Sequence, residues 1–248
     1  MTDVATTPSQ RRAGFTVHAL TASGAIIGFL ALQSVVTGHV RAALVWLVIS
    51  IVIDGIDGPI ARKFDVKVHA PHIDGHVLDL VIDYVTCVVV PVVLMIHADV
   101  VPSALATPLA GLILMSSALW FARTDQETDD AWFNGFPAMW SIVIPAFVIL
   151  GTSQTRAAII SVLFAFAQLT TIKFPHVVRV RAMRRATYTA AILYFAAFFY
   201  MCAYFPHNSD WARAVLLVGP VYLFFIVIWR TWFPHRKMFG QNIVPSSP

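Results

Sequence analysis

The sequence predicts an all-α fold, in which about eight transmembrane helices form one bundle with both termini in the cytoplasm. Of the 248 residues, 58% are hydrophobic and only 12% are charged. The mean hydropathy is +0.74, which is far more apolar than a soluble domain of this size needs. Long uncharged runs recur along the chain, and no change of composition divides it. We therefore expect residues 1–248 to form a single integral-membrane domain.

Each predicted helix corresponds to an apolar run bounded by polar residues. The first follows Arg11 and Arg12, and its length suits a retained helix better than a cleaved signal. The fifth and sixth are short for a hydrocarbon layer about 30 Å thick, so tilt or local thinning of the bilayer is expected there. The segments are Val17–Thr37, Ala42–Ile60, Val77–Met95, Ala104–Phe121, Phe136–Leu150, Ala157–Thr171, Tyr188–Phe205 and Ala212–Trp229.

The distribution of basic residues predicts the orientation, because cytoplasmic loops carry the excess of Lys and Arg. With the N-terminus inside, 3 of the 17 basic residues face outward, namely Arg41, Arg156 and Arg213. The others face inward: Arg11, Arg12, Arg62, Lys63, Lys67, Arg123, Lys173, Arg179, Arg181, Arg184, Arg185, Arg230, Arg236 and Lys237. This asymmetry also explains the isoelectric point near 9.3 without a nucleic-acid partner. Cys87 and Cys202 lie in apolar runs and indicate buried thiols, not a disulfide.

Two pairs of aspartates lie within the second and third apolar segments. Asp54 and Asp57 are spaced i and i+3, and Asp79 and Asp83 are spaced i and i+4, so each pair shares a helix face. An acid at membrane depth is costly unless it is paired, hydrated or bound to metal. If the two faces meet, their oxygens can hold hard divalent cations. Arg62 lies about one turn beyond them and suits a phosphate contact.

The string D-x2-D-G-x2-A-R…G-x3-D-x3-D resembles the signature of the CDP-alcohol phosphotransferase family. Twelve residues separate Arg62 from Gly75, where most members have about eight. This longer spacer is similar to that of the bacterial phosphatidylcholine synthase branch, as are residues 121–137 and 173–176. The matching positions are Asp54, Asp57, Gly58, Ala61, Arg62, Gly75, Asp79 and Asp83.

The resemblance implies that CDP-diacylglycerol and choline react to give phosphatidylcholine and CMP. It implies one or two Mg²⁺ or Mn²⁺ ions, two being the favoured number, held by Asp54, Asp57, Asp79 and Asp83. It further implies that Asp83 is the general base for the choline hydroxyl, and that the site opens to the cytoplasm from a bacterial inner membrane. Residues implied to line the CDP site are Asp57, Gly58, Ala61, Arg62 and Gly75. It leaves both a monomer and a homodimer open.

Choline binding calls for aromatic faces with an acid nearby, because a quaternary ammonium cannot donate a hydrogen bond. The candidates near the predicted cytoplasmic face are Trp140, Tyr84 and Asp125. Aromatic residues there also serve as ordinary interfacial anchors.

Several alternatives remain open at this stage. The acceptor can instead be serine, glycerol phosphate or inositol phosphate, and some relatives join CDP-choline to diacylglycerol. Intramembrane acids also serve cation transporters, although no internal repeat is visible. His69, His72, His76 and Asp74 have a spacing that permits a zinc cluster. The G-x-x-x-G of Gly24 and Gly28 suits either internal helix packing or a dimer.

Overall fold

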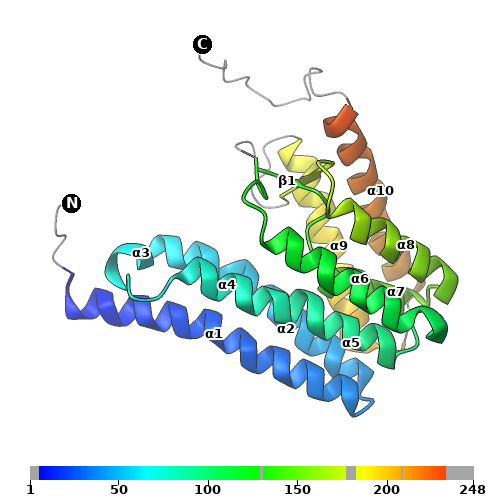
Figure 1. Cartoon of the computed structure of the whole chain (residues 1–248), viewed down its shortest axis with the longest axis horizontal. Helices are drawn as coiled ribbons and strands as arrows, with labels where there is room; N and C mark the ends of the chain where they lie inside the picture. The colour runs from blue at the N-terminus through cyan, green and yellow to red at the C-terminus, as the bar shows by residue number, and fades with distance from the viewer. Residues whose placement is uncertain (1–5, 129–130, 177–182, 208, 233–248) are drawn as a thin grey trace.

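A computed structural model shows a helical bundle with one very small sheet (Figure 1). The structure describes residues 6–128, 131–176, 183–207 and 209–232. Four basic residues used to predict the orientation, Arg179, Arg181, Arg236 and Lys237, lie outside the described residues.

Six helices in the described part of the chain are long and apolar enough to cross a membrane. Three of them are α1 (Pro8–Val36), α2 (Val40–Lys63) and the continuous helix Gly75–His97. The other three are α6 (Ser103–Phe121), α9 (Arg184–Tyr204) and α10 (Asp210–Trp232). The most exposed apolar side chains lie on α9 and α10, where Ile192, Val221 and Phe224 are 68%, 71% and 69% exposed. Outward-facing side chains of this kind are what lipid contact requires.

The prediction of eight spanning helices holds only in part. The fifth and sixth segments form α7 (Trp140–Leu150) and α8 (Gln154–Ala167), with 11 and 14 residues. At 1.5 Å per residue these helices are about 16 and 21 Å long, which is short of a hydrocarbon layer of about 30 Å. Residues before α7 are buried but not helical, so the fifth helix begins four residues later than expected.

The helix that carries Asp79 and Asp83 changes its winding directly after them. It consists of α4 (Gly75–Asp83), the π-helical segment η1 (Tyr84–Val89) and α5 (Val90–His97). Asp74 caps its start, because its carboxylate accepts hydrogen bonds from the backbone N–H groups of His76 and Val77 at 3.0 and 3.2 Å. In η1 the backbone N–H of Val90 reaches back to the carbonyl of Val85. Single π turns of this kind are frequent at functional sites.

The all-α prediction omits a two-stranded antiparallel sheet, in which β1 (Trp132–Asn134) pairs with β2 (Lys173–Pro175). These strands belong to the connections α6–α7 and α8–α9, so both connections lie at the same end of the bundle. The backbone N–H of Lys173 donates to Thr231 Oγ1 at 3.0 Å, which places the end of α10 there too. The connection between α2 and α4 contains α3 (Val66–His69) and lies against the first part of α1, where Gly14 approaches Ala70.

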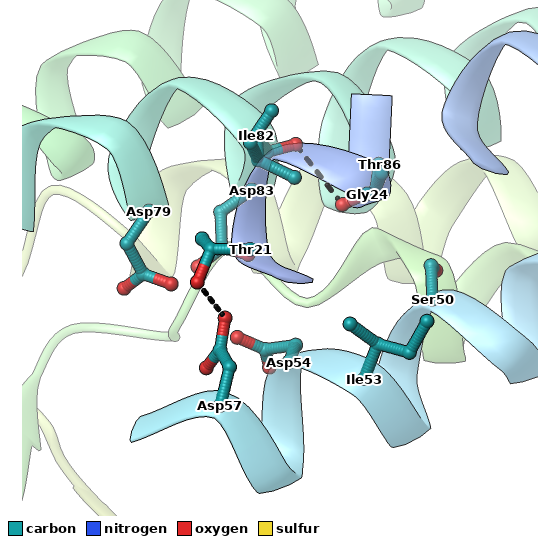
Figure 2. Close-up of a pocket in the computed structure, with 10 residues that line it drawn as sticks. All are labelled: Thr21, Gly24, Ser50, Ile53, Asp54, Asp57, Asp79, Ile82, Asp83 and Thr86. Carbon is teal, nitrogen blue, oxygen red and sulfur yellow. Dashed lines mark hydrogen bonds between the residues drawn. The ribbon is translucent and has the colours of Figure 1, made fainter. Parts of the chain in front are cut away.

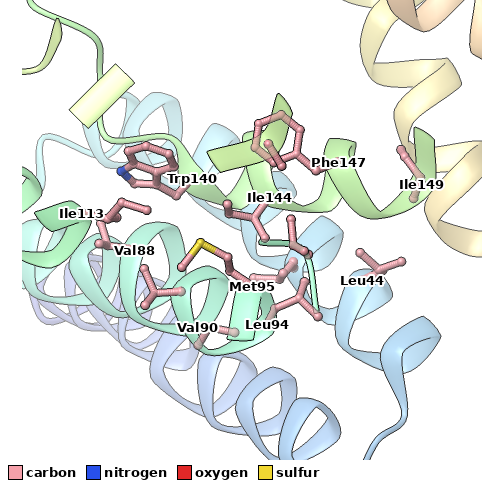
Figure 3. Packing of buried hydrophobic residues seen from close by; sticks show 14 of the residues in the cluster. Leu44, Val88, Val90, Leu94, Met95, Ile113, Trp140, Ile144, Phe147 and Ile149 are labelled. Carbon is pink, nitrogen blue, oxygen red and sulfur yellow. The ribbon is translucent and has the colours of Figure 1, made fainter. Parts of the chain in front are cut away.

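A continuous apolar core joins the two halves of the bundle. Leu94 and Met95 of α5 pack with Ile144 of α7 and Leu44 of α2, and all four are fully buried (Figure 3). In water, burying a side chain of this size stabilises the fold by about 1.5–3 kcal/mol. Within a bilayer, the stabilisation comes mainly from close van der Waals packing between helices. The core therefore joins α7 to both α5 and α2, while α1 packs against both acidic helices, α2 and α4.

Candidate metal centre

Two helices bring the four aspartates to one cavity. Asp54 and Asp57 lie one turn apart on α2, and Asp79 and Asp83 lie one turn apart on α4. One carboxylate oxygen of each of Asp54, Asp57 and Asp79 lies within 4.8 Å of the other two. Figure 2 shows Asp54 and Asp57 rising from α2 towards the α4 residues, so the two acidic faces meet.

Asp83 lines the same cavity as the other three acids. The four acids differ in their access to solvent: Asp57 is only 6% exposed, Asp79 and Asp83 are half-buried, and Asp54 is exposed. Asp57 is therefore the acid whose surface is most completely covered by neighbouring protein atoms.

The charges of these acids must be balanced for the arrangement to persist. Two unit charges 4.8 Å apart, the upper limit of the oxygen separations here, repel by about 3.5 kcal/mol at an effective dielectric constant near 20. The donor set consists only of carboxylate oxygens, which are the ligands that hard divalent cations prefer. The cavity has a volume of about 10 Å³, close to the space that one water molecule needs. The residues present thus fit a divalent cation.

Gly58 and Arg62 lie together at the cytoplasmic end predicted for α2. A Cβ atom on Gly58 would lie 3.4 Å from Arg62 Nη1, so the guanidinium folds back over the glycine. Arg62 is exposed, and Ala61 packs at the edge of a small apolar cluster with Val17 and Val66. The exposed guanidinium of Arg62 therefore lies little more than one helical turn beyond Asp57.

The signature implies that Gly75 lines the CDP site, and in the structure Gly75 lies against His18 of α1. A Cβ atom here would lie 3.1 Å from His18 Cε1, on α1. His18 is buried, with its Nε2 3.4 Å from the carbonyl oxygen of Ala70. The absence of a side chain at Gly75 thus lets α4 begin close against α1.

The structure does not gather the three candidate choline residues at the acidic cavity. Trp140 is fully buried and its indole N–H donates to Ser117 Oγ at 3.0 Å. Asp125 is exposed and forms a two-pronged ion pair with Arg123, with both contacts at 2.8 Å. These hydrogen bonds from Arg123 hold the pKa of the Asp125 carboxyl below its ordinary value.

Tyr84 lies nearest to the acids in sequence, directly after Asp83. Its hydroxyl donates to the carbonyl oxygen of Leu114 at 3.0 Å, and its ring meets the edge of Phe121 with centroids 6.0 Å apart. From Phe121 an aromatic row continues through Trp120 to Phe133. Tyr84 is thus half-buried at one end of an aromatic row, directly after the acidic helix α4.

The zinc alternative finds no support in the described part of the chain. There, the only group of three or more potential metal ligands that lie close together is Asp54, Asp57 and Asp79. Asp74 is engaged as a helix cap, and the ring Nδ1 of His69 lies 3.4 Å from Thr6 Oγ1.

The G-x-x-x-G pair of α1 serves internal packing. A Cβ atom on Gly24 would lie 2.5 Å from Ile82 Cγ2, and one on Gly28 would lie 3.1 Å from Thr86 Cγ2. Both glycines therefore let α1 approach the helix that carries Asp79 and Asp83.

Sequence reasoning missed the contribution of α1 to the cavity. Thr21 lines it, and its Oγ1 donates to Asp57 Oδ2 at 2.8 Å. Ser50 and Thr86 also line it, each with its hydroxyl bonded to its own helix backbone. A threonine at mid-helix in an apolar run gives no sequence signal of such a contact, because the partner is 36 residues away.

Comparison with known proteins assigns the chain to a family. Residues 14–172 match the family described as CDP-alcohol phosphatidyltransferase. The chain belongs to this family. The matched region contains all four aspartates and runs from α1 to the residues before β2.

Relatives within the CDP-alcohol phosphatidyltransferase family resemble the chain over nearly its whole length. A protein of Pseudomonas aeruginosa named phosphatidylcholine synthase is 33% identical over 230 residues, which cover 92% of this chain and 97% of the relative. Proteins of the same name from Agrobacterium fabrum and Borreliella burgdorferi are 32% and 31% identical over 220 residues each. These alignments cover 89% and 87% of this chain and 91% and 93% of the relatives.

Proposed function

We propose that the protein is a CDP-diacylglycerol–choline O-phosphatidyltransferase, which forms phosphatidylcholine and releases CMP. The observation that carries this proposal is the meeting of Asp54, Asp57 and Asp79 across two helices. It occurs in a chain of the CDP-alcohol phosphatidyltransferase family whose relatives of similar length bear the name phosphatidylcholine synthase.

Asp54, Asp57 and Asp79 would hold one divalent cation, Mg²⁺ or Mn²⁺, and Asp83 would complete the ligand set for a second. When bound, such cations neutralise the charge of the diphosphate and of the leaving CMP. Arg62, which is exposed beside Gly58, is placed to contact a phosphate of the donor. Gly58 and Ala61 leave room for the cytidine nucleotide along the same face of α2, and Gly75 keeps the start of α4 close to α1.

Asp83 is the proposed general base. In the reaction, the oxygen of choline forms a bond to the phosphorus that bears diacylglycerol, and the bond from that phosphorus to the CMP oxygen breaks. The hydroxyl proton passes to the Asp83 carboxylate, since an aliphatic alcohol is a weak nucleophile until its proton is removed. Asp83 is half-buried on the cavity that the other three acids line, so it can reach a substrate bound there.

Of the three candidate choline-binding residues, we favour Tyr84. Tyr84 follows the proposed base directly and belongs to the aromatic row of α6 and β1. Binding by Trp140 would require the indole to leave a fully buried position, and Asp125 would have to attract the cation while paired with Arg123.

The proposed orientation puts both termini and the open side of the cavity in the cytoplasm of a bacterial inner membrane. The acids lie in the last turns of α2 and in α4, towards the end of the bundle where α3 connects these helices. This arrangement keeps acyl chains in lipid while the nucleotide meets water. The short helices α7 and α8 would cross only part of the bilayer unless the membrane thins around them.

A direct assay with purified protein tests the proposal. Radiolabelled choline, CDP-diacylglycerol and Mn²⁺ should give labelled phosphatidylcholine and an equal amount of CMP, and excess EDTA should abolish both. Parallel reactions with serine, glycerol phosphate and inositol phosphate examine the other acceptors. Lipid product with one of these and none with choline would show that the acceptor assignment is wrong.

A further inference from the structure

Thr21 forms a hydrogen bond that joins α1 to one of the acids of the cavity. Its Oγ1 donates to Asp57 Oδ2 at 2.8 Å, whereas the backbone alternative, the carbonyl oxygen of Val17, is 3.4 Å away. Because a hydroxyl has a single proton, the shorter contact to the carboxylate is the one it makes. Figure 2 shows Thr21 pointing down from α1 directly at Asp57, with Asp79 to one side.

Other hydroxyl groups on the same helix behave differently. Thr16 and Ser23 both donate to backbone carbonyl oxygens of their own helix, at 3.0 and 2.6 Å. Local bonding of this kind is the ordinary fate of a Ser or Thr within a helix. Thr21 instead reaches across to another helix and to the least exposed of the four acids.

The contact restricts how Asp57 can turn. A hydrogen bond to an ionised carboxylate is about twice as strong as one between neutral groups. Holding one oxygen fixes the plane of the group, while lone pairs on both oxygens remain for a cation. Groups that orient a metal ligand in this way typically affect metal affinity by about 10–100-fold when they are removed.

We propose that Thr21 is a positioning residue that orients Asp57 for cation binding. The proposal rests on the proposed function, since it assigns α1 a part in the same metal-dependent site. It makes the site a product of three helices: α2 and α4 provide the carboxylates and α1 fixes one of them. Because the hydroxyl group makes the contact, a variant that lacks it should bind the cation more weakly than a variant that keeps it.

Mn²⁺ binding to full-length purified protein tests the proposal without relying on turnover. The free Mn²⁺ signal in electron paramagnetic resonance gives the dissociation constant for wild type and for three variants. Thr21→Val, which removes the hydroxyl but keeps the shape, should bind Mn²⁺ about tenfold more weakly. Thr21→Ser keeps the hydroxyl and should bind within about twofold of wild type. Thr16→Val removes a hydroxyl that donates to the backbone carbonyl oxygen of Arg12 on its own helix, and it should leave affinity unchanged.

Activity measurements then separate positioning from a general loss of fold. Thr21→Val should raise the Mn²⁺ concentration for half-maximal rate while the KM for choline stays constant. Its melting temperature without metal should match that of Thr16→Val. Where the valine variant fails to fold, Thr21→Ala, which adds no bulk, takes its place in the same titration.

The two proposals can fail separately. Wild-type affinity for Mn²⁺ in Thr21→Val, or equal weakening in Thr21→Ser, would overturn the role of Thr21 while leaving the proposed reaction intact. If wild-type protein binds Mn²⁺, makes no phosphatidylcholine and loses affinity through Thr21→Val, the role of Thr21 stands and the proposed acceptor is wrong.

Discussion

A methyl group added at Gly24 would lie 2.5 Å from Cγ2 of Ile82, about 1 Å closer than carbon atoms in favourable contact. Ile82 cannot easily turn away, because a β-branched side chain has one strongly preferred rotamer in a helix. It also directly precedes Asp83. We therefore expect Gly24→Ala to push α4 away from α1 and to move Asp79 and Asp83 relative to α2.

The size of the effect follows from the size of this displacement. Overpacking of a well-packed interior typically costs about 1–3 kcal/mol of unfolding free energy. A misplacement of about 1 Å at a catalytic group can lower the rate about 100-fold. Gly24→Ala should thus lower kcat by one to two orders of magnitude together with a lower melting temperature.

Thermal unfolding and choline incorporation would be measured side by side. Gly111→Ala is the matched control, because a Cβ atom there meets nothing within 4 Å. Ile82→Ala combined with Gly24→Ala removes the clashing atom and should recover much of the lost rate. Wild-type stability and rate in Gly24→Ala would refute the reasoning that close contact between α1 and α4 sets the position of the acids.

Asp83→Asn should lower kcat by about 10²–10⁴-fold while binding of CDP-diacylglycerol persists, and a near-normal rate would remove Asp83 as the base. Asp54→Asn should weaken Mn²⁺ binding as well as turnover, as measured by paramagnetic resonance. Tyr84→Ala should raise the KM for choline several-fold. Tyr84→Phe keeps the ring face, so its KM for choline should stay within about twofold of wild type. An equal rise in KM for both variants would count against an aromatic contact with choline. Hydrogen bonds from Arg123 hold the pKa of Asp125 below its ordinary value of 3.8, so the carboxyl stabilises the fold only while it is ionised. Asp125→Asn should therefore lower the melting temperature at pH 7, and this difference should disappear as the pH falls below 3.8; an unchanged difference in acid would contradict the role of the ion pair.

The pairing of the acids within each helix could be predicted because it depends on local periodicity. Spacings of three and four residues place Asp54 with Asp57 and Asp79 with Asp83 on single helix faces whatever the rest of the fold does. The two faces meet because α1 packs against both α2 and α4. The contact of Thr21 with Asp57 depends instead on how α1 crosses α2, and no spacing in the sequence encodes that crossing.

The loop side of the bundle was harder to predict for a similar reason. Strands of three residues, such as β1 and β2, are too short to show an alternating pattern. Gly135 has φ +80° and lies against the carbonyl oxygen of Gln168, so the chain turns there and α7 begins only at Trp140. Residues 136–138 are buried without being helical, which is why composition alone lengthened the fifth segment.

The choline candidates show the limit of composition as evidence. Trp140 and Tyr84 are both aromatic residues near one end of the bundle. Trp140 is fully buried in the core, whereas Tyr84 directly follows the acidic helix α4. Only the packing of α7 against α5 distinguishes them, and that packing involves residues far apart in the sequence.

The central claim is that carboxylates of α2 and α4 share a divalent cation. An experimental structure with Mn²⁺ and CDP, with the metal located by its anomalous scattering, tests it most directly. We predict a manganese peak about 2.1 Å from oxygens of Asp54, Asp57 and Asp79, with the nucleotide phosphates beside it. A peak bound elsewhere, or CDP bound with no metal between these helices, would contradict the account.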